Sequence, residues 1–243
     1  MKTGIQVSSL KPLLKTQAQV RAAFARMAEL GCQYVQLQWI DPEVPIPVIA
    51  DAMKKHNMKS LGTQDFYVTV LGNFEYYVNL NAATDGKWLT VSRIPERCKS
   101  PDGLGIFAEE LAALQEKLNL LGQRVCLHPV SADFAAVPGM NAVEYLLEKL
   151  PWLELCLDLY HLDKNCDDMP AFIRRYAGRI PMVHFKDHRD GMLVPAGQGQ
   201  VNWNGVADAC RDAGVGYALA EQESWEGDPY ECLKQAMDWI GNQ

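Results

Sequence analysis

Residues 153–161 read Leu-Glu-Leu-Cys-Leu-Asp-Leu-Tyr-His, an apolar run with an acidic residue and a histidine near its end. A nearly continuous apolar run of this length is typical of a β-strand buried on both faces, as in a parallel sheet. Asp168 follows as a candidate helix N-cap, and Phe172, Ile173 and Tyr176 then recur at helical spacing. The segment therefore predicts one strand followed by one amphipathic helix.

The same alternation of apolar runs and amphipathic stretches extends in both directions along the chain. The strand-like runs cover residues 5–7, 34–37, 60–63, 88–91, 125–128, 153–159, 180–185 and 217–220. The predicted helices begin at Thr16, near Pro45, within residues 72–81, at Ser100, Asn141 and Asp168, after Asn202, and at Asp228. Eight such units in 243 residues leave about 30 residues for each, a usual length for one strand and helix of a (β/α)8 barrel.

We therefore predict a single (β/α)8 TIM barrel, an α/β fold in which residues 1–243 form one domain. The main alternative is a doubly wound parallel sheet, which often carries a Gly-rich phosphate-binding loop directly after its first strand. No G-x-G-x-x-G sequence follows the first strand-like run, and Gly197-Gln198-Gly199 lies late in the chain. No linker-like or low-complexity segment divides the sequence into two domains.

The composition is that of an ordinary globular protein, with 48% hydrophobic and 22% charged residues. The formal net charge of −7 argues against binding to nucleic acid, which relies on basic surfaces. No apolar run reaches the roughly 18 residues of a membrane span, so we expect no membrane partner. The seven cysteines include no C-x-x-C pair, and we expect them to be reduced packing residues of a cytoplasmic protein.

Four consecutive strand-like runs in the C-terminal half end in a histidine or a carboxylate. These residues are His128, Asp158, His184 and Glu221, and they are 30, 26 and 37 positions apart. In a (β/α)8 barrel the C-terminal ends of all strands meet at one mouth, where active sites lie. A single polar residue at a strand end is more often simply exposed to solvent. Four residues of metal-ligand type at the ends of four consecutive strands favour a metal site. Two imidazoles and two carboxylates suit one divalent ion, with Mn, Co, Zn or Fe favoured over Ca and with Mg also compatible.

The segments around these residues resemble the xylose-isomerase-like barrels, in particular the sugar phosphate isomerase/epimerase group. That group includes ketose 3-epimerases, hydroxypyruvate isomerase and inosose dehydratase. The resemblance covers nearly the whole chain and is clearest in residues 157–161, 183–187, 197–203 and 220–223, with a further similar segment at 94–103. It implies the same four metal ligands, and it implies that His161 points at the substrate. Lys186 resembles a residue that contacts a substrate oxygen or acid group.

The chain departs from the usual pattern of that group at three positions. Many members have a glutamate at the position of His128, where it binds metal and also serves as one of two acid–base carboxylates. Other members carry a His-Asn-His run there, of which this chain keeps only the first histidine. The usual Gly-Glu-Gly and Val-Asp-Trp sequences contain Gln198 and Asn202 here. These changes call a proton shuttle between two carboxylates into question.

The resemblance and the four strand ends together predict a metal-dependent isomerase or epimerase of a small sugar, sugar phosphate or related keto-polyol. The metal would bind the substrate carbonyl and adjacent hydroxyl and stabilise an enediolate, formed when a proton leaves the carbon α to the carbonyl. Glu221 is the predicted base, and Lys186 or His161 would return the proton. Two alternatives stay open, namely an inosose-type dehydratase or lyase and a barrel that binds sugar without turnover. The endonuclease branch of the superfamily is disfavoured by the five histidines and the net charge of −7.

Other residues near the predicted strand ends are candidates for substrate binding. Three glutamines could hydrogen-bond sugar hydroxyls, namely Gln6, Gln38 and Gln64. Lone residues of this kind more often simply lie at the polar rim of a barrel. Arg93 and Arg97 could hold a phosphate or carboxylate, and Trp225 could cover a sugar ring. The expected partner is a sugar-like small molecule. Dimers and tetramers are common in the group, so a homo-oligomer is compatible with the resemblance.

Overall fold

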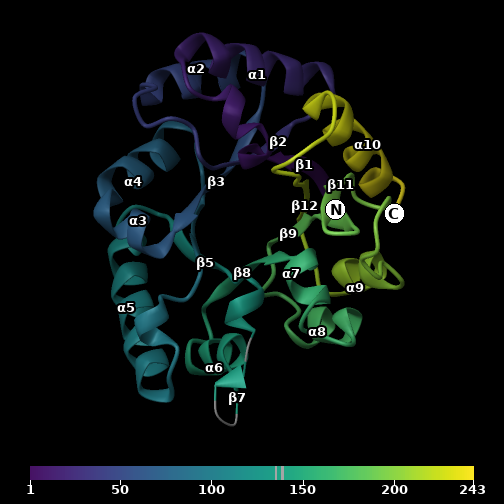
Figure 1. Cartoon of the computed structure of the whole chain (residues 1–243). Helices are drawn as coiled ribbons and strands as arrows, with labels where there is room; N and C mark the ends of the chain where they lie inside the picture. The colour runs from purple at the N-terminus through teal and green to yellow at the C-terminus, as the bar shows by residue number, and fades with distance from the viewer. Residues whose placement is uncertain (135, 138–139) are drawn as a thin grey trace.

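The computed structural model describes residues 1–134, 136–137 and 140–243, and it confirms the predicted barrel (Figure 1). Eight parallel strands close into a barrel in the order β1-β12-β9-β8-β5-β4-β3-β2. They are β1 (Lys2–Gln6), β2 (Tyr34–Leu37), β3 (Lys59–Phe66), β4 (Trp88–Ser92), β5 (Arg124–His128), β8 (Glu154–Asp158), β9 (Met182–Phe185) and β12 (Tyr217–Ala220). Closure occurs where β1 pairs with β12, in a register that sets Lys2 opposite Tyr217.

Helices follow the strands and surround the barrel (Figure 1). They are α1 (Gln17–Glu29), α2 (Ile46–Lys55), α3 (Tyr67–Gly72), α4 (Phe74–Ala83), α5 (Pro101–Asn119), α6 (Ala142–Lys149), α7 (Leu159–Asp163), α8 (Met169–Arg175), α9 (Val206–Asp212) and α10 (Pro229–Gly241). Short 3₁₀ segments cover Val7–Leu13, Glu96–Cys98 and Ser131–Asp133. None of the helices that the structure describes is long and apolar enough to cross a membrane.

Three of the predicted helix starts show the capping that their sequences indicate. Thr16, Ser100 and Asn141 each accept a hydrogen bond from a backbone amide in the first turn of the helix that follows. The first strand, in contrast, lies earlier than predicted and ends at Gln6, because the Gln6 side chain accepts a hydrogen bond from Ser8 N and caps a 3₁₀ segment there. Strand β3 is longer than predicted at both ends.

Two small antiparallel hairpins, which the sequence analysis did not predict, lie outside the barrel sheet. They pair β6 (Ala136–Val137) with β7 (Met140–Asn141) and β10 (Asp187–Arg189) with β11 (Met192–Val194). The second hairpin turns at Asp190 and Gly191, whose φ angles are 51° and 83°. An Asp-Gly pair is one of the strongest hairpin signals because both residues tolerate positive φ, so this turn was readable in the sequence.

The barrel interior follows from the alternation of side chains along each strand. Each of the last four barrel strands has one inward residue below the mouth, and these four are Cys126, Cys156, Met182 and Leu219. They form one buried cluster together with Leu61 and Trp88. The residue two positions further along each strand shares the same face, and these residues are His128, Asp158, His184 and Glu221. A much larger apolar cluster packs the outward faces of the strands against the helices. The period of two along the strands therefore delivers the four predicted ligands to one mouth.

Candidate metal and substrate site

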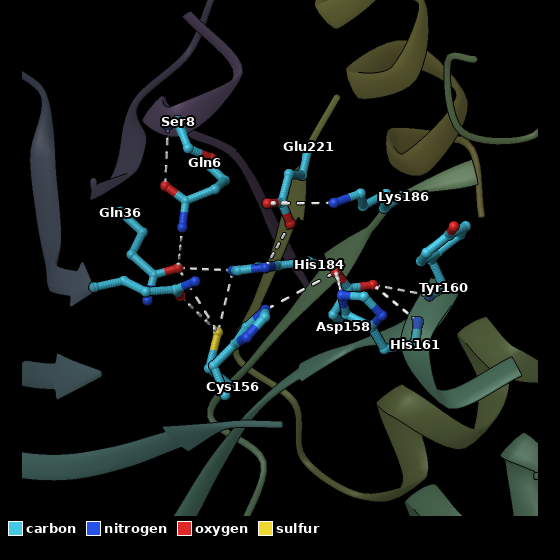
Figure 2. Close-up of polar contacts among 12 residues, drawn as sticks. Gln6, Ser8, Gln36, Cys156, Asp158, Tyr160, His161, His184, Lys186 and Glu221 are labelled. Carbon is cyan, nitrogen blue, oxygen red and sulfur yellow. Dashed lines mark hydrogen bonds and ion pairs between the residues drawn. The ribbon is translucent and has the colours of Figure 1, made fainter. Parts of the chain in front are cut away.

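Four buried side chains converge at the C-terminal mouth of the barrel. His128, Asp158, His184 and Glu221 each offer one ligand atom, and these atoms all lie within 4.8 Å of one another. Each comes from the end of a different neighbouring strand, and none exposes more than 4% of its surface. Figure 2 shows His184 lying between the Glu221 carboxylate on one side and the Gln36 amide on the other. The structure thus brings together all four residues that the sequence predicted.

Each of the four residues has one buried polar atom without a hydrogen-bond partner among the described residues. These atoms are His128 Nε2, Asp158 Oδ2, His184 Nδ1 and Glu221 Oε2. His184 Nδ1 and Glu221 Oε2 are only 2.7 Å apart, yet they are not aligned as a hydrogen bond. One unpaired buried polar atom costs about 1–3 kcal/mol, so four in one place require a common partner. Two imidazole nitrogens and two carboxylate oxygens are a ligand set that fits a divalent transition metal.

Hydrogen bonds behind the cluster determine which imidazole nitrogen is available. His184 Nε2 lies 2.7 Å from Gln36 Oε1, and an amide oxygen can only accept, so Nε2 carries the proton and Nδ1 keeps its lone pair. His128 Nδ1 lies 3.0 Å from Ser92 Oγ, which leaves Nε2 facing the cluster. Partners of this kind orient histidine ligands and select their tautomer in metal sites. His184 therefore presents the lone pair of Nδ1 to the cluster, and His128 faces the cluster with Nε2.

Burial and neighbouring charges set the protonation states of the cluster. Burial, reinforced by the neighbouring His184, holds the pKa of His128 well below its ordinary value. Burial alone would raise the pKa of Glu221, but Lys186 and His184 together hold it well below the usual range. The site therefore contains a neutral imidazole and an ionised carboxylate, which are the forms that bind a cation.

Lys186 lies beside the cluster and is charged. Its Nζ is 3.9 Å from Glu221 Oε1, forms a closer ion pair with Glu223, and lies 5.7 Å from the centre of the Tyr160 ring. Burial opposes the charge, but Glu221 and Asp158 outweigh it and raise the pKa of Lys186 above its ordinary value. Burial and the Glu221 carboxylate in turn raise the pKa of Glu223 to about 7. Lys186 is thus held as an ammonium group.

His161 links the cluster to a large cavity. Its Nε2 is 3.7 Å from Asp158 Oδ2, and its Nδ1 lies 2.9 Å from Ser131 Oγ. His161 and Ser131 also line a cavity of about 750 Å³, together with Ser92 and Arg93 from the end of β4. A cavity of this size holds a small organic molecule. The structure therefore places the predicted substrate residues His161, Arg93 and Arg97 on the wall of one cavity.

The remaining substrate-binding candidates lie elsewhere. Gln6 is fully buried and donates to Gln36 Oε1 at 2.9 Å, and Gln64 lies inside the barrel 3.9 Å from Cys156 Sγ. Gln38 lines a small cavity of about 30 Å³ near the ends of β2 and β3. Trp225 lines a separate cavity of about 440 Å³. Their roles in binding stay predictions.

Several residues of the site were missed in the sequence. Gln36, Ser92 and Ser131 support the histidines. Gln36 could have been found, since it occupies an inward position of a strand-like run where an apolar residue is expected. The two serines could not, because their partners lie on other strands or helices.

The Gly197-Gln198-Gly199 segment also has a role that the sequence did not reveal. Asp187 accepts hydrogen bonds from the backbone amides of both glycines, at 3.0 and 2.9 Å, and from Trp203 Nε1 at 3.0 Å. A Cβ atom on Gly199 would lie 2.1 Å from Asp187 Oδ1, so only glycine fits there. The two glycines therefore allow this loop to wrap around the Asp187 carboxylate.

Residues 14–243 match the family model described as the xylose isomerase-like TIM barrel. The chain belongs to the xylose isomerase-like TIM barrel family. This match confirms the resemblance that the motifs suggested. No curated protein sequence matches the chain.

Solved structures of similar proteins share the whole barrel with this member of the family. A sugar phosphate isomerase/epimerase from Parabacteroides distasonis superimposes with a TM-score of 0.82 at 15% identity, over 98% of this chain and 92% of the other. A 3-keto-D-glucoside 4-epimerase from E. coli gives a TM-score of 0.76 at 19% identity, over 100% of both chains. A probable 3-DHS dehydratase involved in petrobactin synthesis, from Bacillus anthracis, gives 0.77 at 16% identity, over 100% of both chains. At these identities the likeness shows the fold alone.

Proposed function

We propose that this xylose isomerase-like barrel is a metal-dependent isomerase or epimerase of a small sugar, sugar phosphate or related keto-polyol. The observation that carries the proposal is the set of four unpaired, buried ligand atoms at the mouth, from His128, Asp158, His184 and Glu221. A divalent cation held by these residues would act as a Lewis acid toward the oxygens of a bound carbonyl and adjacent hydroxyl. The cavity beside the cluster has room for such a molecule.

Glu221 is the proposed base. Its Oε2 belongs to the ligand cluster, while its Oε1 faces the Lys186 ammonium at 3.9 Å and is free to take a proton. The carboxylate would remove the proton from the carbon next to the substrate carbonyl. The electron pair of that C–H bond then moves into a C=C bond, and the carbonyl π electrons move onto its oxygen, which gives an enediolate.

Lys186 is the proposed acid that completes the reaction. As an ammonium group it can donate a proton to an enediolate carbon. Donation to the carbon that lost its proton, on the opposite face, gives the epimer. Donation to the former carbonyl carbon gives an aldose–ketose shift, in which the hydroxyl proton moves from one enediolate oxygen to the other. The protonated Glu221 can then return its proton to the neutral Lys186 amine, because the two groups are 3.9 Å apart. His161, on the cavity wall 3.7 Å from Asp158, is a second candidate for the returning acid. Lys186 or His161 would thus take over the acid–base role of the glutamate that many family members have at the position of His128.

Loss of a hydroxyl group is the second candidate reaction. The first step is the same proton abstraction by Glu221, but the Lys186 ammonium would then protonate a departing hydroxyl, which leaves as water. The observation that favours this alternative is that Lys186 is held in its charged form by Glu221 and Glu223. An unsaturated ketone product, with new ultraviolet absorbance, would distinguish elimination from isomerisation.

The test of the proposed function is proton exchange in heavy water. The wild-type protein, loaded with Mn, Co or Zn, is incubated with a panel of ketoses and inososes, and deuterium at the carbon next to the carbonyl is followed by NMR. Glu221→Gln should abolish exchange, whereas Glu116→Gln, on the exposed surface of α5, should leave it unchanged. Full exchange in Glu221→Gln would exclude Glu221 as the base. No exchange with any substrate, while a sugar still raises the melting temperature, would support a barrel that only binds sugar.

A further inference from the structure

The cavity beside the metal ligands has a direct connection to them. Ser92 lines the cavity and its hydroxyl contacts His128 Nδ1 at 3.0 Å, and His161 lines it from α7. A molecule in this cavity therefore lies next to the residues that hold His128 and Asp158. The end of the bound molecule that points away from the ligand cluster would face the residues that follow β4.

Three cations face this cavity, and two of them are already neutralised. Arg97 contacts both carboxylate oxygens of Glu110 at 2.9 Å. Lys99 lies 3.2 Å from Glu96 and 3.7 Å from the buried Asp133. Each of these cations is thus matched by at least one carboxylate.

Arg93 is different from the other two. Among the residues that the structure describes, no carboxylate lies within ion-pair distance of its guanidinium, and no acceptor takes a hydrogen bond from it. Its close contact among the described residues is with the ring of Phe66, whose centre is 4.7 Å from the guanidinium carbon and which also lines the cavity. The buried Asp133 carboxylate interacts with the Arg93 charge from beyond ion-pair distance. Arg93 is also exposed to solvent. Its hydrogen-bond donors are available to a ligand.

The backbone of Arg93 is held in an unfavourable conformation at this place. Its φ angle is 65°, in the left-handed region that side-chain-bearing residues rarely adopt. The backbone amide donates to the carbonyl oxygen of His128 at 3.2 Å, which ties this residue to a metal ligand. Strain of this kind persists only where the surroundings enforce it, and it is concentrated at functional sites. The strand end therefore orients Arg93 with respect to the ligand cluster.

We propose that Arg93 forms an anion subsite and that the substrate carries a carboxylate or phosphate group at the end away from the reacting carbon. The planar guanidinium matches the paired oxygens of either anion, and the Phe66 ring supports it from one face. This inference rests on the proposed function, because it takes the cavity as the substrate site. It narrows the substrate class from neutral sugars to acidic or phosphorylated ones.

The test compares neutral and anionic probes of the same shape by isothermal titration calorimetry. One pair is D-fructose and D-fructose 6-phosphate, and the other is D-glucitol and D-gluconate. The anionic member of at least one pair should bind wild-type protein about tenfold more tightly, as expected for one exposed charge-assisted contact. Arg93→Gln should remove this preference and Arg93→Lys should keep part of it. Arg97→Gln, the same substitution at a cation already paired with Glu110, should retain it in full.

The outcomes separate this inference from the proposed function. A preference for phosphate alone or for gluconate alone would identify which anion the subsite accepts. Equal affinity within both pairs, or a preference that survives Arg93→Gln, would overturn the subsite, and thermal unfolding of each variant excludes misfolding as the cause. Failure of proton exchange with every substrate would refute the enzyme mechanism, yet it would leave an Arg93-dependent preference for anions intact.

Discussion

Gln36 and His184, which lie 148 positions apart in the sequence, share a hydrogen bond of 2.7 Å between Gln36 Oε1 and His184 Nε2. A series of hydrogen bonds that starts at a backbone amide determines which atom of this bond is the donor and which is the acceptor. Ser8 N donates to Gln6 Oε1 at 3.4 Å, and Gln6 Nε2 donates to Gln36 Oε1 at 2.9 Å (Figure 2). The Gln36 amide nitrogen donates to Thr90 at 3.0 Å, which holds the amide in this orientation. The imidazole is therefore protonated at Nε2, and its Nδ1 is available to a metal.

Replacing Gln36 should weaken metal binding without removing a ligand. In Gln36→Leu the imidazole of His184 loses the acceptor that selects its tautomer, and the affinity for a divalent ion should fall about 10- to 100-fold. Competition with a chelating dye measures this affinity. Gln64→Leu is the matched control, because Gln64 is buried in the same barrel but makes only a 3.9 Å contact with Cys156. Equal affinities for Gln36→Leu and wild type would contradict the proposed role of the bond.

The wild-type protein should contain close to one divalent ion per chain. His184→Ala should lose this ion, because it removes one of four ligand atoms and leaves Glu221 without its neighbour at 2.7 Å. Plasma mass spectrometry of purified protein measures the content. His56→Ala, at the end of α2, should retain the metal. If neither wild type nor variant contains metal after addition of Mn, Co or Zn, the cluster does not form a metal site.

Removing the Lys186 charge should block turnover but leave metal content unchanged. In Lys186→Met the enediolate loses its proposed proton donor, so kcat on any substrate found in the panel should fall about 10²- to 10⁴-fold. Lys164→Met is the control, since Lys164 is also close to Tyr160 but is exposed. A kcat within threefold of wild type would assign the proton return to another group, with His161 as the next to test.

The loop that closes over Asp187 should depend on a glycine at position 199. Gly199→Ala places a methyl group 2.1 Å from Asp187 Oδ1 and 2.3 Å from His188 O, and should lower the free energy of unfolding by about 3 kcal/mol. Urea denaturation measures this change. Gly216→Ala is the control, because its nearest atom, Pro181 O, is at an ordinary contact distance of 3.4 Å, and the effect should stay within about 0.5 kcal/mol. Equal stability of the two variants would show that the loop can move away from Asp187.

The four ligands were predictable because a barrel repeats one local rule. Side chains along each strand point alternately into and out of the barrel, and each strand ends at the mouth. Inward-pointing polar residues at the ends of neighbouring strands must therefore face one another. Cys126 with His128 and Met182 with His184 illustrate the rule, since each pair is two positions apart on one inner face. The eight strands and most helix caps were predictable for the same reason, because alternation and capping act within a few residues.

The supporting contacts could not be predicted, because they join residues from distant parts of the chain. Nothing local distinguishes Arg93 from Arg97, yet Arg97 contacts Glu110 on α5 while Arg93 has no carboxylate within ion-pair distance among the described residues.

By itself the sequence determined the barrel, the order of its strands and the four residues at its mouth, because short-range periodicity encodes each of these. Only the tertiary structure decided which nitrogen of His184 is free, which arginine is available to a ligand, and that Lys186 is held charged by Glu221 and Glu223. These properties depend on hydrogen bonds and charges that act over a few ångströms in space between residues tens of positions apart. No pattern within a single segment records such distances.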